Sequence, residues 1–322
     1  MPRQARLDIC GLVYHVMARG IEGREIFNDD SDREFFLKRL SDVFSAPGGP
    51  TLYAWALIPN HFHLLIRSAE VHLSTVMQRL MTGYAVNFNK QHNRKGHFFQ
   101  NRYKSIVVEE DSYFLELVRY IHLNPVRAGI VKSIGGLASY PFTGHAVIMD
   151  GRKFPIQNTD EVLARFSDKR SKALSEYQNF VFSGIEHGTR KDLQGGGLIR
   201  SAGGLSALLA RSPDEHEAAD ERILGGGDFV KMVLNAHGKA HDSHLSFIDD
   251  ILQNIAAGSG VSRDQILGPS RHRVVSKARR SFYRQAQEEA GASMALLARM
   301  TGRAHVSVAR AIEQARRESG DK

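Results

Sequence analysis

The chain has 322 residues, a formal net charge of +8 at pH 7, and ordinary proportions of hydrophobic (42%) and charged (24%) residues. This length suffices for two domains with a core each, and the basic balance points to a polyanionic partner, most commonly nucleic acid. Cys10 is the only cysteine, which excludes an intramolecular disulfide and a zinc site built on thiolates. No apolar run approaches about 18 residues, and residues 1–10 hold no apolar signal core, so we expect a cytoplasmic chain without a membrane partner.

The first 150 residues mix strand and helix signals. Strands are expected at 12–18, 52–58, 62–66 and 105–108, and helices at 32–44 and 73–89. A further helix, capped by Asp111 or Ser112, is expected to run to about Asn124, with Pro125 just beyond its end. This order predicts an α+β fold, an antiparallel sheet with helices on one face.

Beyond residue 150 the sequence contains a glycine-rich segment and then a helical, basic segment. Glycine runs at 195–197, 203–204 and 225–227 favour a loosely structured connector over residues 186 to 240. After residue 241 the signals are almost entirely helical, with helices expected at 245–257, 273–290, 293–300 and 305–318. From Arg263 to Arg317, twelve Lys or Arg stand against four Asp or Glu, so this region is strongly basic.

Two histidines stand two residues apart in the segment Pro59-Asn60-His61-Phe62-His63-Leu64-Leu65. In a strand, alternate residues point to the same side, so His61 and His63 present two imidazoles on one face. Two imidazoles can ligate a divalent metal and leave positions open for substrate oxygens. For such a pair taken alone, the alternative is two partly buried histidines with a structural role.

A tyrosine and an asparagine stand four residues apart in the segment 119–125, Arg-Tyr-Ile-His-Leu-Asn-Pro. Near the end of a helix, Tyr120 and Asn124 share a face. The Tyr120 hydroxyl is a candidate nucleophile if a metal polarises the phosphate that it attacks, and Asn124 offers an oxygen to that metal. The alternative is a tyrosine packed on the sheet and an asparagine that ends the helix. Tyr103 and Tyr113 compete as nucleophiles, but neither has a candidate ligand four residues on.

These segments together resemble the single-tyrosine HUH transposases of bacterial insertion sequences, especially the REP-associated tyrosine transposases. The resemblance covers about residues 8 to 145, and it rests on four blocks in order: 14–20 (Tyr-His-Val-Met-Ala-Arg-Gly), 58–64 (Ile-Pro-Asn-His-Phe-His-Leu), 96–105 (Gly-His-Phe-Phe-Gln-Asn-Arg-Tyr-Lys-Ser) and 120–128 (Tyr-Ile-His-Leu-Asn-Pro-Val-Arg-Ala). It implies a ferredoxin-like sheet with the His-Phe-His motif on a central strand.

The same resemblance implies a reaction and its residues. His61 and His63 bind Mg²⁺ or Mn²⁺, and Asn124 stands where the REP-associated group has its third ligand. Tyr120 attacks a phosphate of single-stranded DNA near hairpins, expels a 3′-hydroxyl and forms a 5′-phosphotyrosine that another 3′-hydroxyl can reverse. The relatives act as dimers or monomers, so either a monomer or a homodimer is expected.

Basic and aromatic side chains in the same region are candidate DNA contacts. Arg102 and Lys104 flank Tyr103 in a strand-like segment, so both point to one side, and Arg19 precedes a glycine in an expected loop. Four aromatic residues are candidates for stacking on unpaired bases or for the core: Tyr84, Phe88, Phe98 and Phe99.

The basic C-terminal region is typical of a helix-turn-helix. Its first helix is expected at 293–300, its turn at Gly302 and its recognition helix at 306–315. Residues 270–279 (Ser-Arg-His-Arg-Val-Val-Ser-Lys-Ala-Arg) and 303–308 (Arg-Ala-His-Val-Ser-Val) resemble the DNA-binding domain of the bacterial replication initiator DnaA. The alternative is a basic helical bundle that docks on the first domain.

The second resemblance implies two sets of duplex DNA contacts. The set that positions the duplex is Arg271, Arg273 and Lys277, and the set that reads bases is Arg303, His305, Val306 and Ser307. Ala304 stands where that family usually has Asp, and residues 306–307 replace its Thr-Thr, so base preference does not carry over.

We therefore expect a catalytic transposase domain over 1–150, a helical extension and Gly-rich connector over 151–240, and a DnaA-like all-α domain over 241–322. Three alternatives remain open. A domesticated DNA-binding protein without catalysis is disfavoured because the candidate catalytic residues are intact. A metal-dependent hydrolase unrelated to DNA would need a water-activating acid that the His-Phe-His motif lacks. A replication initiator or relaxase often adds a third histidine or a second tyrosine, and the spacing here fits the transposases better.

Overall fold

The computed structural model describes residues 6–185, 193, 219–290, 292 and 294–318. The chain divides into two compact units, Met1–Asn235 and Ala236–Lys322. Most of the expected connector, residues 186–192 and 194–218, lies outside the described residues. In the part that is described, no helix is long and apolar enough to cross a membrane.

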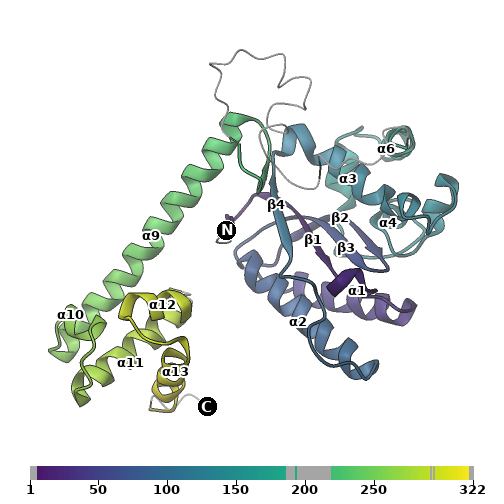
Figure 1. The fold of residues 1–322 in the computed structure, drawn as a ribbon. Coiled ribbons are helices and arrows are strands. Elements are labelled where there is room, and N and C mark those ends of the chain that lie inside the picture. The colour runs from purple at the N-terminus through teal and green to yellow at the C-terminus, as the bar shows by residue number, and fades with distance from the viewer. Residues whose placement is uncertain (1–5, 186–192, 194–218, 291, 293, 319–322) are drawn as a thin grey trace. The chain divides into compact units, whose positions relative to one another are not determined.

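The first unit is built on a five-stranded sheet with the order β2-β3-β1-β4-β5 (Figure 1). The strands are β1 (Val13–Arg19), β2 (Thr51–Ile58), β3 (His61–Arg67), β4 (Lys104–Val108) and β5 (Ile223–Leu224). The first four strands pair antiparallel, with β1 between β3 and β4. With one helix between β1 and β2 and another between β3 and β4, this is the expected ferredoxin-like βαββαβ arrangement. The short β5 pairs parallel to β4, which the sequence did not predict.

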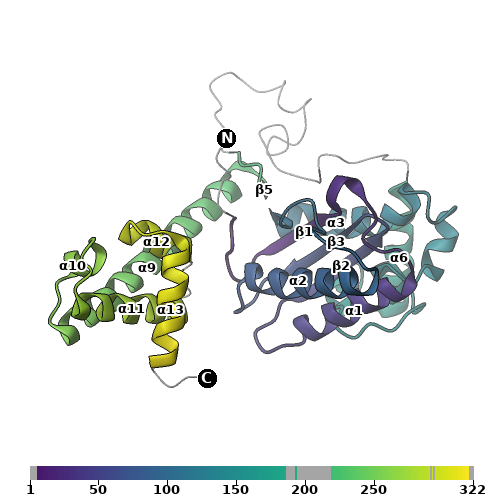
Figure 2. The same ribbon diagram turned by 60° about the horizontal axis from the view of Figure 1, so that its bottom comes forward.

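Helices cover both faces of this sheet, so the expectation of helices on one face is wrong. Its helical segments are η1 (Ile21–Gly23), α1 (Asp30–Phe44), α2 (Leu73–Gln91), α3 (Glu110–Arg127), η2 (Ile134–Ser139), α4 (Gly144–Ile148), α5 (Thr159–Ala164) and α6 (Arg170–Ser183). On one face, Tyr14 and Val16 belong to a core cluster with residues of α1 and α2. On the other face, Val13 and Leu65 belong to a cluster with residues of α3 and α6. Figures 1 and 2 show α1 and α2 on one side of the sheet and α3 and α6 on the other. Both faces are apolar because the strands carry apolar residues at odd and even positions.

Helix α3 does not end before Pro125, as expected, but continues to Arg127 with the proline inside it. Proline has no backbone N–H, so the carbonyl of Ile121 loses its usual partner four residues on. The side-chain amide of Asn124 donates to this carbonyl at 3.4 Å and to the carbonyl of Tyr120 at 3.0 Å. Asn124 therefore compensates the lost bond and lets the helix pass through the proline.

The turn after β1 depends on Gly20, whose N–H donates to the Asn60 carbonyl at 2.9 Å. A Cβ at Gly20 would lie 2.1 Å from the Arg24 carbonyl oxygen and 2.9 Å from the Ile26 side chain. We expect Gly20→Ala to lower the free energy of unfolding by about 1–3 kcal/mol, because the backbone must shift to admit the methyl group. Urea unfolding measures this. The matched control is Gly226→Ala, where nothing lies within 4 Å of the added methyl group, and an equal loss in both variants would contradict the steric account.

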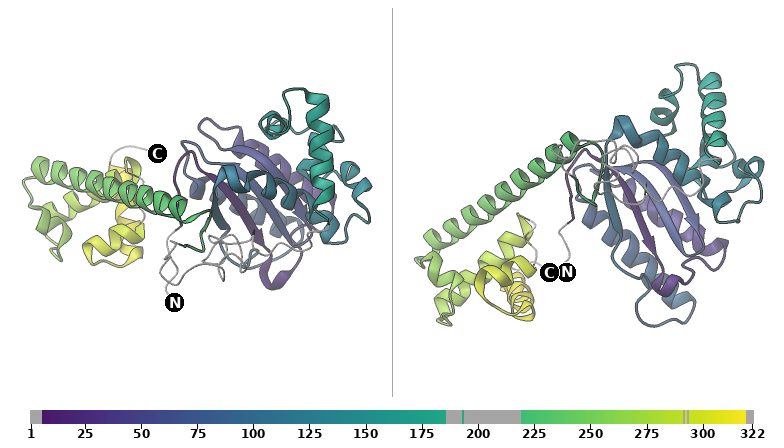
Figure 3. Two further views of the ribbon diagram at one scale, coloured as in Figure 1. Left: turned by 90° about the horizontal axis from the view of Figure 1, so that it is seen from above. Right: turned by 45° about the horizontal axis from the view of Figure 1, so that its top comes forward.

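In the second unit, the described residues form helices and the turns that connect them. Its helices are α9 (Gly227–Ser259, which begins in the first unit), α10 (Arg263–Leu267), α11 (Arg273–Glu288), α12 (Met294–Thr301) and α13 (His305–Glu318). Helices α10 to α13 gather at the C-terminal end of α9 (Figure 3), where Leu252, Phe282, Leu297 and Val308 share one core. The helix expected at 245–257 is longer than predicted: α9 begins at Gly227, the last residue of the glycine run at 225–227.

Candidate active site

The two histidines of the His-Phe-His motif lie on β3 next to the central strand β1. In the strand register His61 is opposite Arg19 and His63 is opposite Met17. The two imidazole ring centroids are 4.9 Å apart, with the ring planes at 81°. The side chains of His61 and His63 therefore converge on one face, as the strand period predicts.

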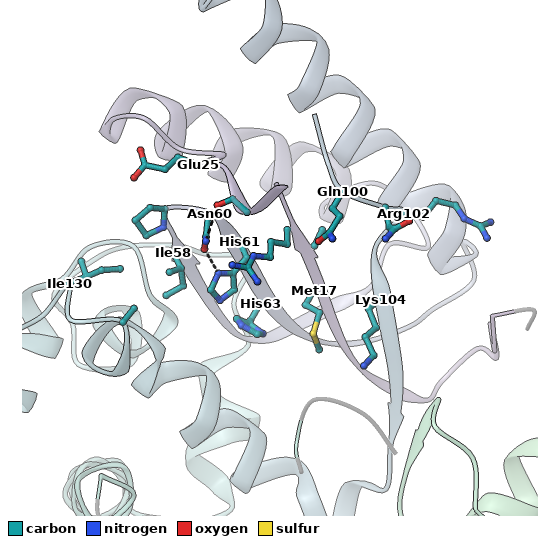
Figure 4. Close-up of a pocket in the computed structure, with 16 residues that line it drawn as sticks. Met17, Glu25, Ile58, Asn60, His61, His63, Gln100, Arg102, Lys104 and Ile130 are labelled. Carbon is teal, nitrogen blue, oxygen red and sulfur yellow. Dashed lines mark hydrogen bonds between the residues drawn. The ribbon is translucent and has the colours of Figure 1, made fainter. Parts of the chain in front are cut away.

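Each imidazole of the pair uses its Nδ1 atom in a hydrogen bond. His61 Nδ1 lies 2.6 Å from the side-chain oxygen of Asn60 (Figure 4). His63 Nδ1 lies 2.9 Å from Nε2 of His15, a residue of β1. The Nε2 atom of each ring of the pair is therefore the one left to bind a ligand.

Burial keeps these rings neutral. It lowers the pKa of His61 to about 4, and the nearby Arg19 cation lowers it further. Burial also lowers the pKa of His63 well below its ordinary value and the pKa of His15 to about 4. At neutral pH the imidazoles are therefore in the uncharged form, which is the form that binds metal ions.

Tyr120 lies on helix α3, and its ring packs against two of these imidazoles. Its ring centroid lies 5.8 Å from that of His63 and 5.9 Å from that of His15, both in edge-to-face geometry. The guanidinium carbon of Arg127, two turns further along the helix, lies 5.4 Å from the centre of the tyrosine ring. Only 3% of Tyr120 is exposed, so its side chain is buried beside His63.

A cavity of about 740 Å³ opens in front of the histidine pair (Figure 4). Three cations line it, and they are the three that the sequence singled out: Arg19, Arg102 and Lys104. The backbone atoms or side chains of Asn60, Gln100 and Asn101 add polar groups. A pocket of this charge suits the phosphodiester backbone of a nucleic acid.

The sequence model of a protein family described as "Transposase IS200 like" matches residues 9–124. This span contains the four antiparallel strands, the histidine pair and Tyr120. Residues 9–124 are therefore similar to the IS200-like transposases. The resemblance to single-tyrosine transposases is confirmed for this part of the chain.

Among solved structures, the chain is similar to one titled "Structure of the REP associates tyrosine transposase bound to a REP hairpin". The two share 15% sequence identity with a TM-score of 0.38, over 49% of this chain and 98% of that chain. No curated protein matches the chain. The resemblance of residues 270–308 to DnaA stays a prediction.

Two residues expected at the catalytic centre do not line this cavity. Tyr120 and Asn124 are absent from the lining, although Ala128 and Ile130 just beyond them are part of it. Asn124 is partly buried, and its amide nitrogen is engaged with helix carbonyls. The aromatic candidates Tyr84, Phe88 and Phe98 are buried in the core of the domain, and Phe99 packs partly buried against it.

In the second unit, the residues expected to contact duplex DNA are mostly exposed. Arg271, Arg273 and Lys277 are exposed at the start of α11. Val306 (59%) and Ser307 are exposed in the first turn of α13. The His305 side chain lies outside the described part.

Arg303 is engaged within the second unit itself. One of its guanidinium nitrogens donates to the Pro269 carbonyl at 2.9 Å, with the Ser270 carbonyl at 3.4 Å. The side chain thereby ties the turn between α12 and α13 to the loop before α11. Base reading by Arg303 would require these bonds to be exchanged.

Sequence reasoning gave no role to three residues: His15 and Asn60, which lie within hydrogen-bonding distance of the histidine pair, and Arg127, which lies over the Tyr120 ring. His15 lies on the same side of β1 as Met17 and Arg19, which the strand period alone could have indicated. The Arg127 position depends on α3 continuing past its proline, which the sequence did not predict.

Proposed function

We propose that this protein is a metal-dependent transposase that cleaves and rejoins single-stranded DNA at hairpin-associated sites. One observation carries the proposal. The Tyr120 ring packs edge-to-face on His63, whose ring lies 4.9 Å from that of His61. Both imidazoles are neutral and line a cavity with three cations, in a segment that matches the model of the IS200-like family. A nucleophile, a pair of metal ligands and a phosphate-binding surface are the components that DNA strand transfer needs.

The donor set fits Mg²⁺ or Mn²⁺ with room for substrate. Among the described residues no group of three or more His, Cys, Asp or Glu side chains could hold a metal ion, so an ion at the histidine pair would need oxygen ligands from other groups, from water or from the DNA. His61 and His63 would supply two nitrogen ligands, and the Asn124 side-chain oxygen would supply a third. An ion held there would offset the charge that develops on the attacked phosphate.

The protein's own residues would then bind and orient the DNA. Arg19, Arg102 and Lys104 would hold backbone phosphates in the cavity. The Tyr120 oxygen would attack the phosphorus in line, forming a phosphotyrosine bond at the 5′ side while the bond to the 3′-oxygen breaks. Because Tyr120 is nearly buried, its side chain must turn toward the cavity before it attacks. The reverse step, attack by a new 3′-hydroxyl, rejoins the strand without water or a nucleotide.

A strand-cleavage assay tests this function. The substrates are labelled single-stranded hairpin oligonucleotides from the DNA beside the protein's gene, with the same sequences as full duplexes for comparison. We expect cleavage and rejoining of the single strands with Mg²⁺ or Mn²⁺ and none with EDTA. Equal cleavage of the duplexes, or cleavage that persists in EDTA, would contradict the proposal.

Metal binding should be visible as stabilisation of the fold. A ligand that binds only the folded state at 100 times its dissociation constant adds about 2.7 kcal/mol. We therefore expect Mn²⁺ to raise the melting temperature of the wild type, and His61→Ala to abolish this rise because one of two imidazole ligands is lost. The matched control is His97→Ala, an exposed histidine that does not line the cavity. A rise in the His61→Ala variant equal to that of the wild type would contradict metal binding at this pair.

We further propose that the second unit binds duplex DNA through the start of α11 and the first turn of α13. The exposed cations Arg271, Arg273 and Lys277 would contact phosphates, and Val306 would offer an apolar surface to a thymine methyl group. Each phosphate contact changes the slope of log affinity against log salt by about 0.9.

The salt dependence of duplex binding tests this second proposal. Removing one phosphate contact with Arg273→Gln should weaken binding to all duplexes and lower the salt slope by about 0.9, measured by fluorescence anisotropy. The matched control is Arg317→Gln, an exposed arginine paired with Glu313 near the end of α13, which should change little. Equal effects of the two substitutions would indicate a diffuse charge effect and not a defined contact.

A further inference from the structure

Three buried groups form a hydrogen-bonded line that ends at the histidine pair. His15 Nδ1 lies 3.3 Å from the Leu193 carbonyl oxygen, and His15 Nε2 lies 2.9 Å from His63 Nδ1. His15 has no exposed surface and His63 only 3%, and the two rings stack at 5.1 Å. The proposed strand-transfer reaction gives His15 no part.

We propose that His15 is a positioning residue that keeps the proton of His63 on Nδ1, so that the His63 Nε2 lone pair is available to a divalent metal ion. This inference rests on the proposed function, because it assigns His15 a part in the metal site of that function. It adds a residue that neither contacts the ion nor lines the cavity.

The position of the proton on each ring follows from which atoms of the two hydrogen bonds can donate and which can only accept. A carbonyl oxygen only accepts hydrogen bonds, so His15 Nδ1 must carry the proton that points at Leu193. A neutral imidazole has a single N–H, so His15 Nε2 is an acceptor. The hydrogen bond between the rings is then donated by His63 Nδ1, which leaves His63 Nε2 with its lone pair.

The surroundings favour the neutral forms that this argument needs. Both rings are buried, and the hydrogen bonds of His15 are to a carbonyl oxygen and the other ring. A charged imidazole without a carboxylate partner is costly in such a place. If His15 were doubly protonated, it would donate to His63 Nδ1 and force the His63 proton onto Nε2, where it would block a metal ion.

The strand register brings the two rings together. His15 is opposite Leu65 and His63 is opposite Met17, so His15 and His63 are diagonal neighbours on one face of β1 and β3. The fixed backbone pairing holds the His15 nitrogen at the same place as long as the sheet is intact.

A parallel arrangement at the other histidine argues against a purely structural role for His15. The Asn60 side-chain oxygen accepts from His61 Nδ1 at 2.6 Å and leaves Nε2 of that ring free in the same way. Two different polar residues thus hold two adjacent imidazoles in the same tautomer. Partners of this kind orient metal-binding histidines, and their loss typically lowers metal affinity about 10–100-fold.

Two substitutions at His15 separate positioning from packing. His15→Leu keeps an apolar side chain in the core but removes the acceptor, whereas His15→Gln offers an amide oxygen to His63 Nδ1. We expect His15→Leu to weaken Mn²⁺ binding about 10–100-fold by calorimetry. We expect His15→Gln to recover most of this loss, with both variants folded by circular dichroism.

Nitrogen-15 NMR of the metal-free protein reads the tautomer directly. We expect His63 to carry its proton on Nδ1 in the wild type and in His15→Gln, and to shift toward the Nε2-protonated form in His15→Leu. An unchanged His63 tautomer in His15→Leu, or wild-type Mn²⁺ affinity in that variant, would overturn the proposal. If His15→Leu fails to fold, an Nε2-protonated His63 in the wild type or in His15→Gln overturns it, and Nδ1 protonation in both supports it. A wild type that binds no Mn²⁺ would overturn both the metal site and the part that we assign to His15 in it.

Discussion

The variant Tyr120→Phe is expected to lose strand cleavage by at least about 1000-fold, because the attacking oxygen is gone. Phenylalanine keeps the ring that packs against His63 and His15, so the fold should remain. The initial cleavage rate on the single-stranded hairpin substrate and the melting temperature measure the two effects. A large loss of rate with an unchanged melting temperature separates chemistry from stability.

Matched controls come from the other tyrosines that the sequence left as candidates. Tyr103 is nearly buried, lies under the Arg6 guanidinium at 4.1 Å, and has its pKa raised by burial to about 12. Tyr103→Phe and Tyr113→Phe should therefore cleave at rates close to the wild type. If instead Tyr120→Phe cleaves normally and Tyr103→Phe does not, the nucleophile has been assigned to the wrong residue.

A second large effect is expected on acidification, since the first unit buries several histidines as neutral rings. Burial lowers the pKa of His15, His61 and His145 to about 4, and that of His63 and His122 well below the ordinary value near 6.5. These groups bind protons in the unfolded chain at a higher pH than in the folded one. The stability that they support is fully present above about pH 6.5 and is lost as the pH falls toward 4.

The expected loss in the free energy of unfolding at acidic pH is large compared with the total stability of one domain. A single imidazole whose pKa moves from 6.5 to about 4 destabilises the fold by about 3 kcal/mol at pH 4, and total stabilities are only about 5–15 kcal/mol. Metal-free protein should therefore keep its stability from pH 8 to 7 and unfold between about pH 6 and 4. The free energy of unfolding at each pH is measured by urea unfolding. The signal is the fluorescence of Trp55, which is the only tryptophan of the sequence and is fully buried in this unit.

A histidine outside the His61–His63 pair provides the control for this prediction. His145 Nδ1 lies 2.7 Å from the Tyr177 hydroxyl, in a buried cluster with His122. His145→Gln removes one titrating group, so the loss of stability between pH 6.5 and 5 should become shallower by about one proton. A wild-type stability that stays constant down to pH 5 would contradict the account.

The sequence predicted the four antiparallel strands and the first three helices because their periodicities are local. The side on which His61 and His63 lie follows from the same local rule. Other features depend on partners far along the chain. The pairing of His15 with His63 requires the register of two strands, because these residues are 48 positions apart in the chain. The two-residue strand β5 is too short to give any pattern.

The position of Tyr120 shows why motif spacing alone does not complete a site. Spacing placed Tyr120 and Asn124 on one helix face, and the structure brings the tyrosine ring to the histidines but keeps it out of the cavity lining. Burial at that point depends on how α3 packs on the sheet, which no local pattern encodes.

The most direct test of the central claim is to identify the residue that becomes covalently attached to DNA. Wild-type protein is incubated with the single-stranded hairpin substrate and Mn²⁺, digested with nuclease and trypsin, and analysed by mass spectrometry. The tryptic peptide 120–127 contains a single tyrosine, Tyr120, so its modification is unambiguous. We predict a nucleotide on this peptide in the presence of Mn²⁺ and none in EDTA. A nucleotide on another peptide, or DNA cleavage without any covalent adduct, would contradict the account.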